Sequence, residues 1–146
     1  MHVRNICQTL PLFNLKTIAD PAPDIDFTQN LEDVDISDNI DSVLSDNKIE
    51  AVVVCSPTPT HYDIIKKCAA RKKHVFCEKP VSFSEDEIKE LSKVLEKNKK
   101  VNILSDDIYE HVRYDNFNFY TIAQISKLKD RTLTMNGVSK SYAMTG

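Results

Sequence analysis

The first hundred residues alternate between short apolar runs and amphipathic helical patterns, and this alternation limits the fold more than any other feature. The segment "IEAVVVCSP" (49–57) is a continuous apolar run with three valines, which is typical of a strand buried on both faces of a parallel sheet. Similar strand patterns cover 13–20, 73–80 and 100–104. Strands that alternate with helices predict βαβ units. We therefore expect an α/β fold built on a parallel sheet with helices on both faces.

Apolar residues at helical spacing identify the segments between these strands. The periodicity predicts helices over 2–10, 37–46, 61–72 and 85–95. Two capping-box patterns mark the starts of the last two helices, Thr60 with Asp63 and Ser84 with Glu87.

The amino-acid composition of the sequence changes near residues 100–105. The segment "YEHVRYDNFNFY" (109–120) is rich in aromatic residues, and it is followed by a short helical pattern at 121–128 and a strand pattern at 131–137. We therefore expect two regions, 1–100 and 101–146, the second being a short α/β tail.

Charge and hydropathy exclude several classes of function. The net charge of −3 argues against an electrostatic nucleic-acid partner, because phosphate contacts need clustered Lys and Arg. The basic cluster "KKCAARKK" (66–73) is read as the solvated end of a helix. No stretch approaches 18 apolar residues, so we expect no membrane segment.

The four cysteines point to a reducing compartment. Cys7, Cys55, Cys68 and Cys77 form no CxxC pair and have no His at zinc spacing, so we expect no metal site. Most of them lie in apolar runs and are expected to be buried thiols. Free buried thiols fit a cytoplasmic location.

Glycine is scarce, since the chain holds only Gly137 and Gly146. A GxGxxG phosphate loop is therefore absent from the first 136 residues. Early turns must instead be made by Asn, Asp, Pro and Ser.

Polar residues follow three of the predicted strands, where ligands bind in a doubly wound sheet. Asp20 ends the strand at 13–20, "CSPTPTH" supplies Ser56, Thr58 and His61, and "EKP" supplies Lys79. A carboxylate at such a strand end can accept hydrogen bonds from ribose hydroxyls. The ordinary alternatives are a turn opener for Asp20, a helix start for His61 and a solvated loop residue for Lys79.

The segment "AVVVCSPTPTHYDIIKKCAARKKHVFCEKPVS" resembles the glucose–fructose oxidoreductase/inositol dehydrogenase (Gfo/Idh/MocA) family, over roughly residues 1–100. The resemblance implies an incomplete Rossmann-like domain without the family's first strand and glycine loop, and NAD(P) as cofactor. It implies that Lys79 lies near the nicotinamide and polarises the substrate hydroxyl, and that Asp20 contacts the ribose. It also implies a special, cis-prone peptide before Pro80. The cofactor cleft would be lined by Ser56, Thr58, His61 and Glu78.

The tail carries residues suited to pyridoxal phosphate (PLP). PLP needs a lysine amine for covalent attachment and a carboxylate on its ring nitrogen. Lys140 in "NGVSK" and Asp106 in "SDDIY" are 140 − 106 = 34 residues apart, which leaves room for one more strand. "SDDIYEHVRYDNFNFY" and "NGVSKSYAMTG" resemble fold-type I aminotransferases of the aspartate type. The resemblance makes Lys140 the PLP lysine, Asp106 the nitrogen partner and Tyr109 the partner of the phenolic oxygen, with Ser139 near the phosphate.

Both resemblances are partial, so we read the chain as a fusion of two fragments. The first hypothesis is a relic of an NAD(P)-dependent oxidoreductase, joined to an aminotransferase fragment and without full catalytic activity. The second is a PLP-binding aminotransferase relic. The third is an inert or interaction-only polypeptide, with self-association through the aromatic residues of the tail, Tyr109, Phe117, Phe119 and Tyr120.

Overall fold

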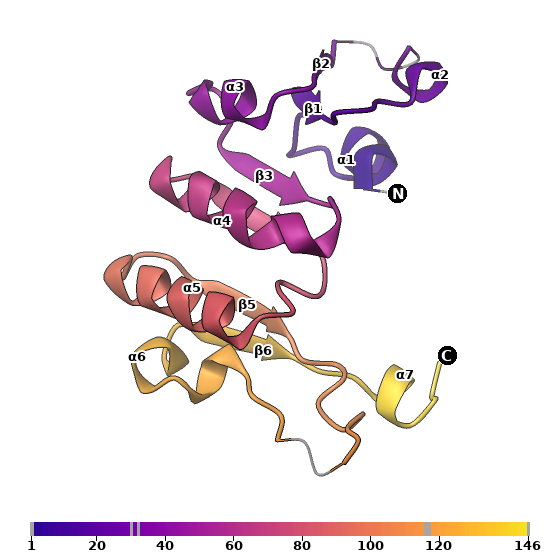
Figure 1. Cartoon of the computed structure of the whole chain (residues 1–146). Coiled ribbons are helices and arrows are strands. Elements are labelled where there is room, and N and C mark those ends of the chain that lie inside the picture. The colour runs from indigo at the N-terminus through magenta and orange to yellow at the C-terminus, as the bar shows by residue number, and fades with distance from the viewer. Residues whose placement is uncertain (1, 30, 32, 116–117, 146) are drawn as a thin grey trace. The chain divides into compact units, whose positions relative to one another are not determined.

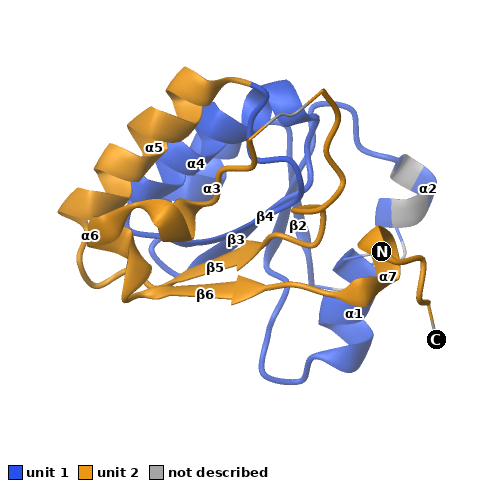
Figure 2. Cartoon of the chain, turned by 90° about the horizontal axis from the view of Figure 1, so that it is seen from below, with its two compact units in different colours: residues 1–83 blue, residues 84–146 orange. Residues whose placement is uncertain are grey.

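The computed structural model describes residues 2–29, 31, 33–115 and 118–145. The chain divides into two compact units, residues 1–83 and 84–146 (Figures 1 and 2). Within both units the described strands pair in parallel, and helices lie between them in the sequence. The expected α/β class with parallel strands is confirmed.

Unit 1, residues 1–83, contains two parallel strand pairs. Its strands pair as β1 with β2 and as β3 with β4, and the helix α4 packs against β3 and β4. The elements are α1 (His2–Thr9), β1 (Thr17–Ala19), α2 (Ile25–Thr28), β2 (Asp35–Ser37), α3 (Ile40–Ser45), β3 (Ala51–Val54), a 3₁₀ turn η1 (Thr58–Thr60), α4 (His61–Ala70) and β4 (His74–Cys77).

The β3–β4 register sets which backbone groups are bonded. Val54 pairs with Cys77, and the amide of Glu78 donates to Val54 O at 3.0 Å. In a parallel ladder alternate residues bond to the same neighbouring strand. Val52 and Val54 therefore bond with β4, while Ala51 and Val53 direct their backbone groups to the opposite edge.

The buried apolar residues of unit 1 lie on α3, which packs against β1 and β2, and on α4 and β3, where α4 packs against β3 and β4. They are Val43, Leu44, Val54 and Cys68. Leu44 of α3 and Cys68 of α4 are almost fully buried, at 2% and 0% exposure.

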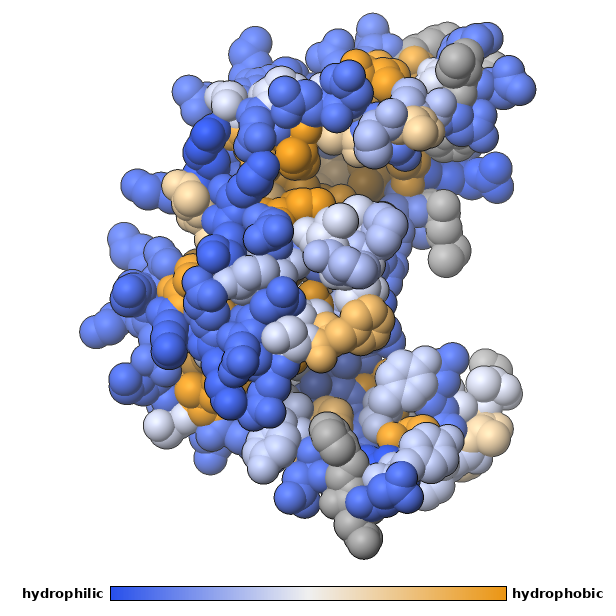
Figure 3. All heavy atoms as spheres, viewed as in Figure 1, coloured by the Kyte–Doolittle hydropathy of each residue, from blue (hydrophilic) through white to orange (hydrophobic). Residues whose placement is uncertain are grey.

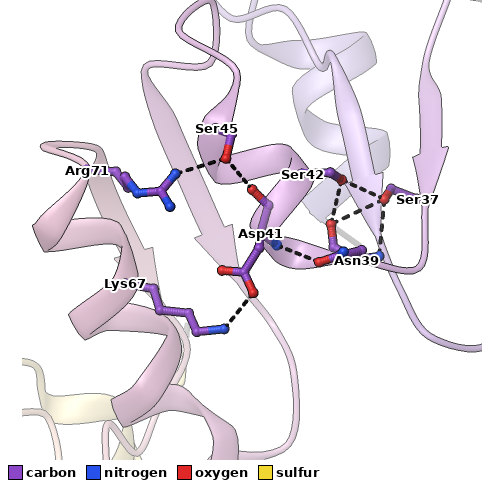
Figure 4. A network of polar contacts seen from close by, with 7 residues as sticks. All are labelled: Ser37, Asn39, Asp41, Ser42, Ser45, Lys67 and Arg71. Carbon is purple, nitrogen blue, oxygen red and sulfur yellow. Dashed lines mark hydrogen bonds and ion pairs between the residues drawn. The ribbon is translucent and has the colours of Figure 1, made fainter.

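Polar contacts tie α3 to α4 at the surface (Figure 4). Asn39 caps α3 through a hydrogen bond from Asp41 N, and Lys67 Nζ lies 2.9 Å from the Asp41 carboxylate. Arg71 donates to Ser45 Oγ at 2.9 Å. Within the basic cluster, Lys67, Arg71 and Lys72 are exposed, as expected for a helix end, whereas Lys66 and Lys73 are half-buried. Lys67 and Arg71 also bond to α3.

Unit 2, residues 84–146, pairs a strand from before the aromatic segment with a strand from after it. The β5–β6 pairing is parallel and aligns Ile103 with Thr132 and Asp106 with Met135. Its elements are α5 (Glu85–Lys97), β5 (Ile103–Asp106), a 3₁₀ turn η2 (Ile122–Gln124), α6 (Ser126–Lys129), β6 (Thr132–Met135) and α7 (Val138–Ser141). The short helix and the strand expected in the tail are confirmed.

Arg131 links α6 and β6 to the end of α5. Its guanidinium donates to the carbonyl oxygens of Leu95, Asn98 and Val101. These carbonyls belong to the last turn of α5 and the loop after it, where Leu95 O also accepts from Asn98 N and Asn98 O from Val101 N. The Arg131 side chain therefore caps the carboxyl end of α5.

The two predicted capping boxes differ in outcome. Ser84 caps α5 by accepting from Glu87 N at 3.4 Å, as predicted. The box at Thr60 is wrong, because Thr60 makes no capping bond to α4. Its hydroxyl lies 2.6 Å from Ser56 Oγ and donates to Pro57 O at 2.8 Å.

The cysteines are less buried than expected. Cys68 is buried and Cys77 half-buried, but Cys7 and Cys55 are exposed, so the prediction of mostly buried thiols is wrong. No disulfide joins them in the described chain. Among the described helices, none has the length and apolar character needed to cross a bilayer.

Large apolar side chains remain on the surface of unit 2. Tyr109, Tyr114 and Tyr120 are 47%, 78% and 75% exposed, whereas Phe119 is half-buried. Phe117 lies outside the described residues. Apolar side chains also show among hydrophilic ones in the space-filling view (Figure 3).

Candidate functional site

The loops after β3 and β4 lie at one edge of their sheet, because the two strands run parallel. Ser56 and Thr58 follow β3 and are half-buried. Glu78, half-buried, directly follows β4, and Lys79 and Pro80 are exposed. The Lys79–Pro80 peptide bond is cis, as the resemblance implied.

His61 bridges these two loops from the first residue of α4. Its side chain is buried, at 1% exposure. Nδ1 lies 2.9 Å from Pro80 O and Nε2 lies 2.7 Å from Ser56 O. A backbone carbonyl can only accept, so a ring nitrogen that bonds here does so as an N–H donor.

Glu78 is anchored by a residue that sequence reasoning missed. His2 Nε2, in the first turn of α1, lies 2.5 Å from Glu78 Oε1, and its ring lies 5.7 Å from the Phe76 ring, centre to centre. Glu78 Oε2 also accepts from Lys79 N at 3.4 Å. The bond from His2, and then the bond from Lys79 N, lower the pKa of Glu78 below its ordinary value. No sequence signal pointed to His2, because the contact spans 76 positions.

The thiols beside this edge are poor nucleophiles. Burial, followed by the nearby Cys55 and Glu78, raises the pKa of Cys77 to about 11. Cys55 is exposed as a residue, but partial desolvation of its thiol and then the charge of Glu78 raise its pKa. A thiol reacts as its thiolate, so neither residue suits covalent catalysis near neutral pH.

Asp20 directly follows β1 and is exposed. Its amide donates to Ser37 O at 2.9 Å, which continues the β1–β2 ladder. Its Oδ1 atom accepts from Ala22 N at 2.9 Å, so the carboxylate is held in a turn. An exposed, oriented carboxylate at a strand end has the chemistry to accept from ribose hydroxyls. Asp20 follows a strand of the β1–β2 pair, whereas the hydroxyls of Ser56 and Thr58 follow a strand of the separate β3–β4 pair.

The second set of predicted site residues lies at the carboxyl ends of β5 and β6. Asp106 ends β5, is exposed, and accepts from Ile108 N at 3.3 Å. Ser139, half-buried, and Lys140, exposed, lie in α7, four and five residues beyond the end of β6. Tyr109 is 47% exposed.

Contacts beyond the β5–β6 ladder hold α7 near the loop after β5. Asp107 N donates to Met135 O at 2.9 Å, and Ser141 Oγ donates to Ile108 O at 3.5 Å. A Cβ atom added at Gly137 would lie 3.4 Å from Ile108 Cδ1, so the loop packs closely there. An exposed carboxylate and an exposed lysine amine at the ends of adjacent parallel strands fit the donor set that PLP requires.

Asp107 is the buried polar residue of this site, and sequence reasoning missed it. At 8% exposure, its Oδ1 accepts from Ser105 Oγ at 2.9 Å and its Oδ2 accepts from Thr121 Oγ1 at 2.5 Å. The tandem "DD" gave no indication of which carboxylate turns inward. The hydroxyl residue two positions before it was the available signal, since it can bond a carboxylate on the same side of a strand.

Comparisons with known proteins match different parts of the chain. Residues 1–105 match the model of an oxidoreductase family with an NAD-binding Rossmann fold. Residues 80–146 match the model of aminotransferase class I and II. The two matches overlap over residues 80–105, which include α5 and most of β5.

Curated relatives fall into the same two groups. The "Probable aspartate/prephenate aminotransferase" of Rickettsia bellii is 56% identical over 66 residues, which are 44% of this chain and 16% of that protein. The "Uncharacterized oxidoreductase YrbE" of Bacillus subtilis is 41% identical over 92 residues, which are 62% of this chain and 27% of that protein. The chain thus spans less than a third of the length of either relative.

Solved structures share the fold of the first part. A scyllo-inositol dehydrogenase from Lactobacillus casei has a TM-score of 0.63 and 23% identity, and the match covers 69% of this chain and 30% of that one. An oxidoreductase from Bacillus cereus has a TM-score of 0.58 and 26% identity, with 66% and 28% covered. Both matches support a Rossmann-type arrangement of the strands and helices.

Proposed function

The chain belongs to the oxidoreductase family with an NAD-binding Rossmann fold, and on that premise we propose that it is a relic dinucleotide-binding domain without full catalytic activity. In this proposal it retains a weak NAD(P) site in unit 1. The aminotransferase-like segment that follows is, in the same proposal, a fused fragment.

The observation that carries the proposal is the linked pair of loops after β3 and β4. The Nε2 and Nδ1 atoms of the buried His61 ring lie 2.7 Å from Ser56 O and 2.9 Å from Pro80 O, so the ring spans the two loops. Ligands bind at the carboxyl ends of the strands in this class of sheet. The loops therefore lie where a nicotinamide dinucleotide would bind.

Each proposed contact follows from the side-chain chemistry. The Asp20 carboxylate accepts from ribose hydroxyls, and the hydroxyls of Ser56 and Thr58 bond to polar groups of the cofactor. The Lys79 amine, exposed beside Glu78, is the cation that polarises a substrate hydroxyl near the nicotinamide. Bound NAD(P) would supply the hydride-transfer chemistry.

We expect binding to be weak because residues 1–136 contain no glycine. Glycines allow a backbone to approach a pyrophosphate closely at the start of a helix. Losing several amide hydrogen bonds at roughly 1 kcal/mol each lowers the affinity by orders of magnitude. The expected dissociation constant is therefore about 1 mM or weaker.

Amide NMR spectra recorded during titration with NADH and NADPH test this proposal. Shifts at residues 56–60 and 78–80 that saturate at millimolar ligand are expected, and they should weaken in Asp20→Ala and Lys79→Ala. Lys93→Ala, on the exposed surface of α5, is the matched control. A micromolar dissociation constant would contradict the proposal of a relic and would favour a catalytically active enzyme. An absence of shifts at about 10 mM ligand would exclude the dinucleotide site.

A PLP site in unit 2 is the second candidate, favoured by the β5–β6 register that aligns Asp106 with Met135. Asp106 would bond to the ring nitrogen, Tyr109 to the phenolic oxygen and Ser139 to the phosphate, while Lys140 supplies the amine.

Borohydride reduction after mixing with PLP distinguishes a site from random labelling, because it fixes the cofactor on each lysine that holds it. We expect scattered labelling of surface lysines and no transamination of aspartate with 2-oxoglutarate. A single label on Lys140 at stoichiometric PLP, lost in Asp106→Ala, would favour a surviving PLP site. Labelling of Lys93 serves as the internal control for a surface lysine.

An interaction-only role is the third candidate, favoured by the exposed Tyr109, Tyr114 and Tyr120. Exposed apolar patches promote association, so we propose self-association through this segment. Sedimentation velocity over a hundredfold dilution should show dissociation, and Tyr114→Ser with Tyr120→Ser should shift the equilibrium to monomer. A monomer at every concentration would exclude it.

A further inference from the structure

We infer that His61 is a positioning residue, which holds the loops after β3 and β4 at a fixed separation without touching the cofactor. The inference rests on the dinucleotide site proposed above. It replaces the cleft-lining role that sequence resemblance implied for this side chain.

The His61 side chain is almost completely buried. Only 1% of the residue is exposed, so a ligand in the cleft would meet the loops before it met the ring. Both ring nitrogens lie within hydrogen-bond distance of backbone carbonyls, at 2.9 Å from Pro80 O and 2.7 Å from Ser56 O. A carbonyl only accepts, so a neutral ring donates to one of the two carbonyls, and both bonds form at once only when both ring nitrogens carry a proton.

The two carbonyls that His61 contacts belong to the loops after β3 and β4. Pro80 directly follows Lys79, so a shift of its carbonyl is transmitted to the lysine. Beyond the last ladder bond, from Glu78 N to Val54 O at 3.0 Å, the bond to His61 fixes the path of the continuing loop. On the other side, Ser56 is further held by its contact with Thr60 Oγ1 at 2.6 Å. The His61 ring thus connects the loop after β3, which the Ser56–Thr60 contact holds, with the loop after β4, which carries Lys79.

Three substitutions separate the two bonds from the packing of the ring. In His61→Asn the amide nitrogen takes approximately the place of Nδ1 and keeps a donor for Pro80 O. In His61→Gln it takes approximately the place of Nε2 and keeps a donor for Ser56 O. His61→Phe keeps the ring shape and donates to neither carbonyl, so it separates bonding from filled volume.

Amide NMR spectra of the full chain, recorded without ligand, give the first readout. His61→Asn should shift the amides of residues 55–58 more than those of 79–82, and His61→Gln should do the reverse. His61→Phe should shift both groups. If each of the three variants shifts the amides of 55–58 and of 79–82 to the same extent, His61 has a packing role only and the proposal is overturned.

Titration with NADH gives the second readout. His61→Asn and His61→Gln each remove one contact of the ring, so each should weaken NADH binding about twofold to tenfold. This range corresponds to the net free energy of one hydrogen bond. His61→Phe should weaken it further. If His61→Phe folds and binds NADH as the unmodified chain does, the proposal is wrong. If the unmodified chain binds no NADH, the dinucleotide proposal fails, while the amide shifts still decide the role of His61.

A measurement on the unmodified protein covers the case in which these variants do not fold. Long-range ¹H–¹⁵N spectra of the imidazole should show a ring N–H that exchanges slowly with solvent, because the ring is buried and bonded. Ring N–H signals that are all lost to rapid exchange would overturn the proposal without any substitution.

Discussion

The Nε2 atom of His2 lies 2.5 Å from the Oε1 atom of Glu78, and the two residues are 76 positions apart in the sequence. The bond joins the first turn of α1 to the residue that follows β4. Glu78 is also bonded through its backbone to Val54, so one residue connects a helix, two strands and the candidate cofactor edge. Predictions about this edge can therefore be tested at His2 as well as in the loops.

His2→Ala should raise the pKa of Glu78 toward its ordinary value of 4.5, because the bond from His2 is the main cause of the lowering. A carboxyl whose pKa is lower when folded than when unfolded stabilises the fold above the unfolded value. That contribution is lost as the pH falls through the lowered folded value. ¹³C NMR titration of the Glu78 carboxyl measures the change. Glu85 is the control, since Lys89 causes its lowering, and it should not respond to His2→Ala. An unchanged Glu78 pKa would show that the bond is absent in solution.

Amide hydrogen exchange along β3 should alternate. Val52 and Val54 donate into the ladder with β4 and should exchange slowly, whereas Ala51 and Val53 direct their amides to the other edge and should exchange faster. Peptide-bonded neighbours serve as each other's control here, since they share the same local stability. Slow exchange at both Ala51 and Val53 would show that another strand or partner pairs with this edge in solution.

Asp107→Ala should destabilise unit 2 by about 1–3 kcal/mol, because it leaves the hydroxyls of Ser105 and Thr121 without their acceptor in a buried position. Asp107→Asn keeps one acceptor oxygen and should lose less. Urea unfolding followed by the tyrosine signals of unit 2 measures both. Asp106→Ala, at the exposed neighbouring carboxylate, is the control and should change stability by roughly 0.5 kcal/mol or less. Equal losses at both positions would contradict the inward orientation of Asp107.

Much of the fold was predictable from local patterns. The apolar run at 49–57 and the strand pattern at 73–80 became β3 and β4, and Ser84 caps α5 as its spacing with Glu87 indicated. These features depend on residues within a few positions of one another. The distribution of hydrogen bonds over three separate strand pairs was not predictable, because pairing depends on segments far apart in the chain.

The site was predictable in its residue types but less so in their roles. The strand ends identified Ser56, Glu78 and Lys79, while the burial of His61 depends on Pro80, 19 positions later. Thr60 failed as a helix cap because Ser56 and Pro57 engage its hydroxyl, and nothing in a capping-box spacing excludes such a competing bond. The roles of the dinucleotide-site residues and of the PLP-site residues both stay predictions; they are Asp20, Ser56, Thr58, Glu78, Lys79 and Pro80, and Asp106, Tyr109, Ser139 and Lys140.

Arg131→Met should loosen the carboxyl end of α5 while leaving its amino end intact. The guanidinium supplies donors to three carbonyls, at Leu95, Asn98 and Val101, and methionine supplies none. We expect a loss of about 1–3 kcal/mol in the stability of unit 2, since hydrogen bonds from charged donors lie in that range. Arg131→Lys should recover only part of it, because a single ammonium cannot reproduce the planar fork of the guanidinium.

Amide exchange at Asn98 is the direct measurement, because its amide donates to Val94 O and Leu95 O in the last turn of α5. It should accelerate in Arg131→Met, whereas Ile88, whose amide donates to Ser84 O at the start of the helix, should change little. Arg113→Met removes an equal charge from an exposed position and controls for net charge. If Asn98 and Ile88 accelerate to the same extent, Arg131 stabilises unit 2 globally and does not act as the cap of α5.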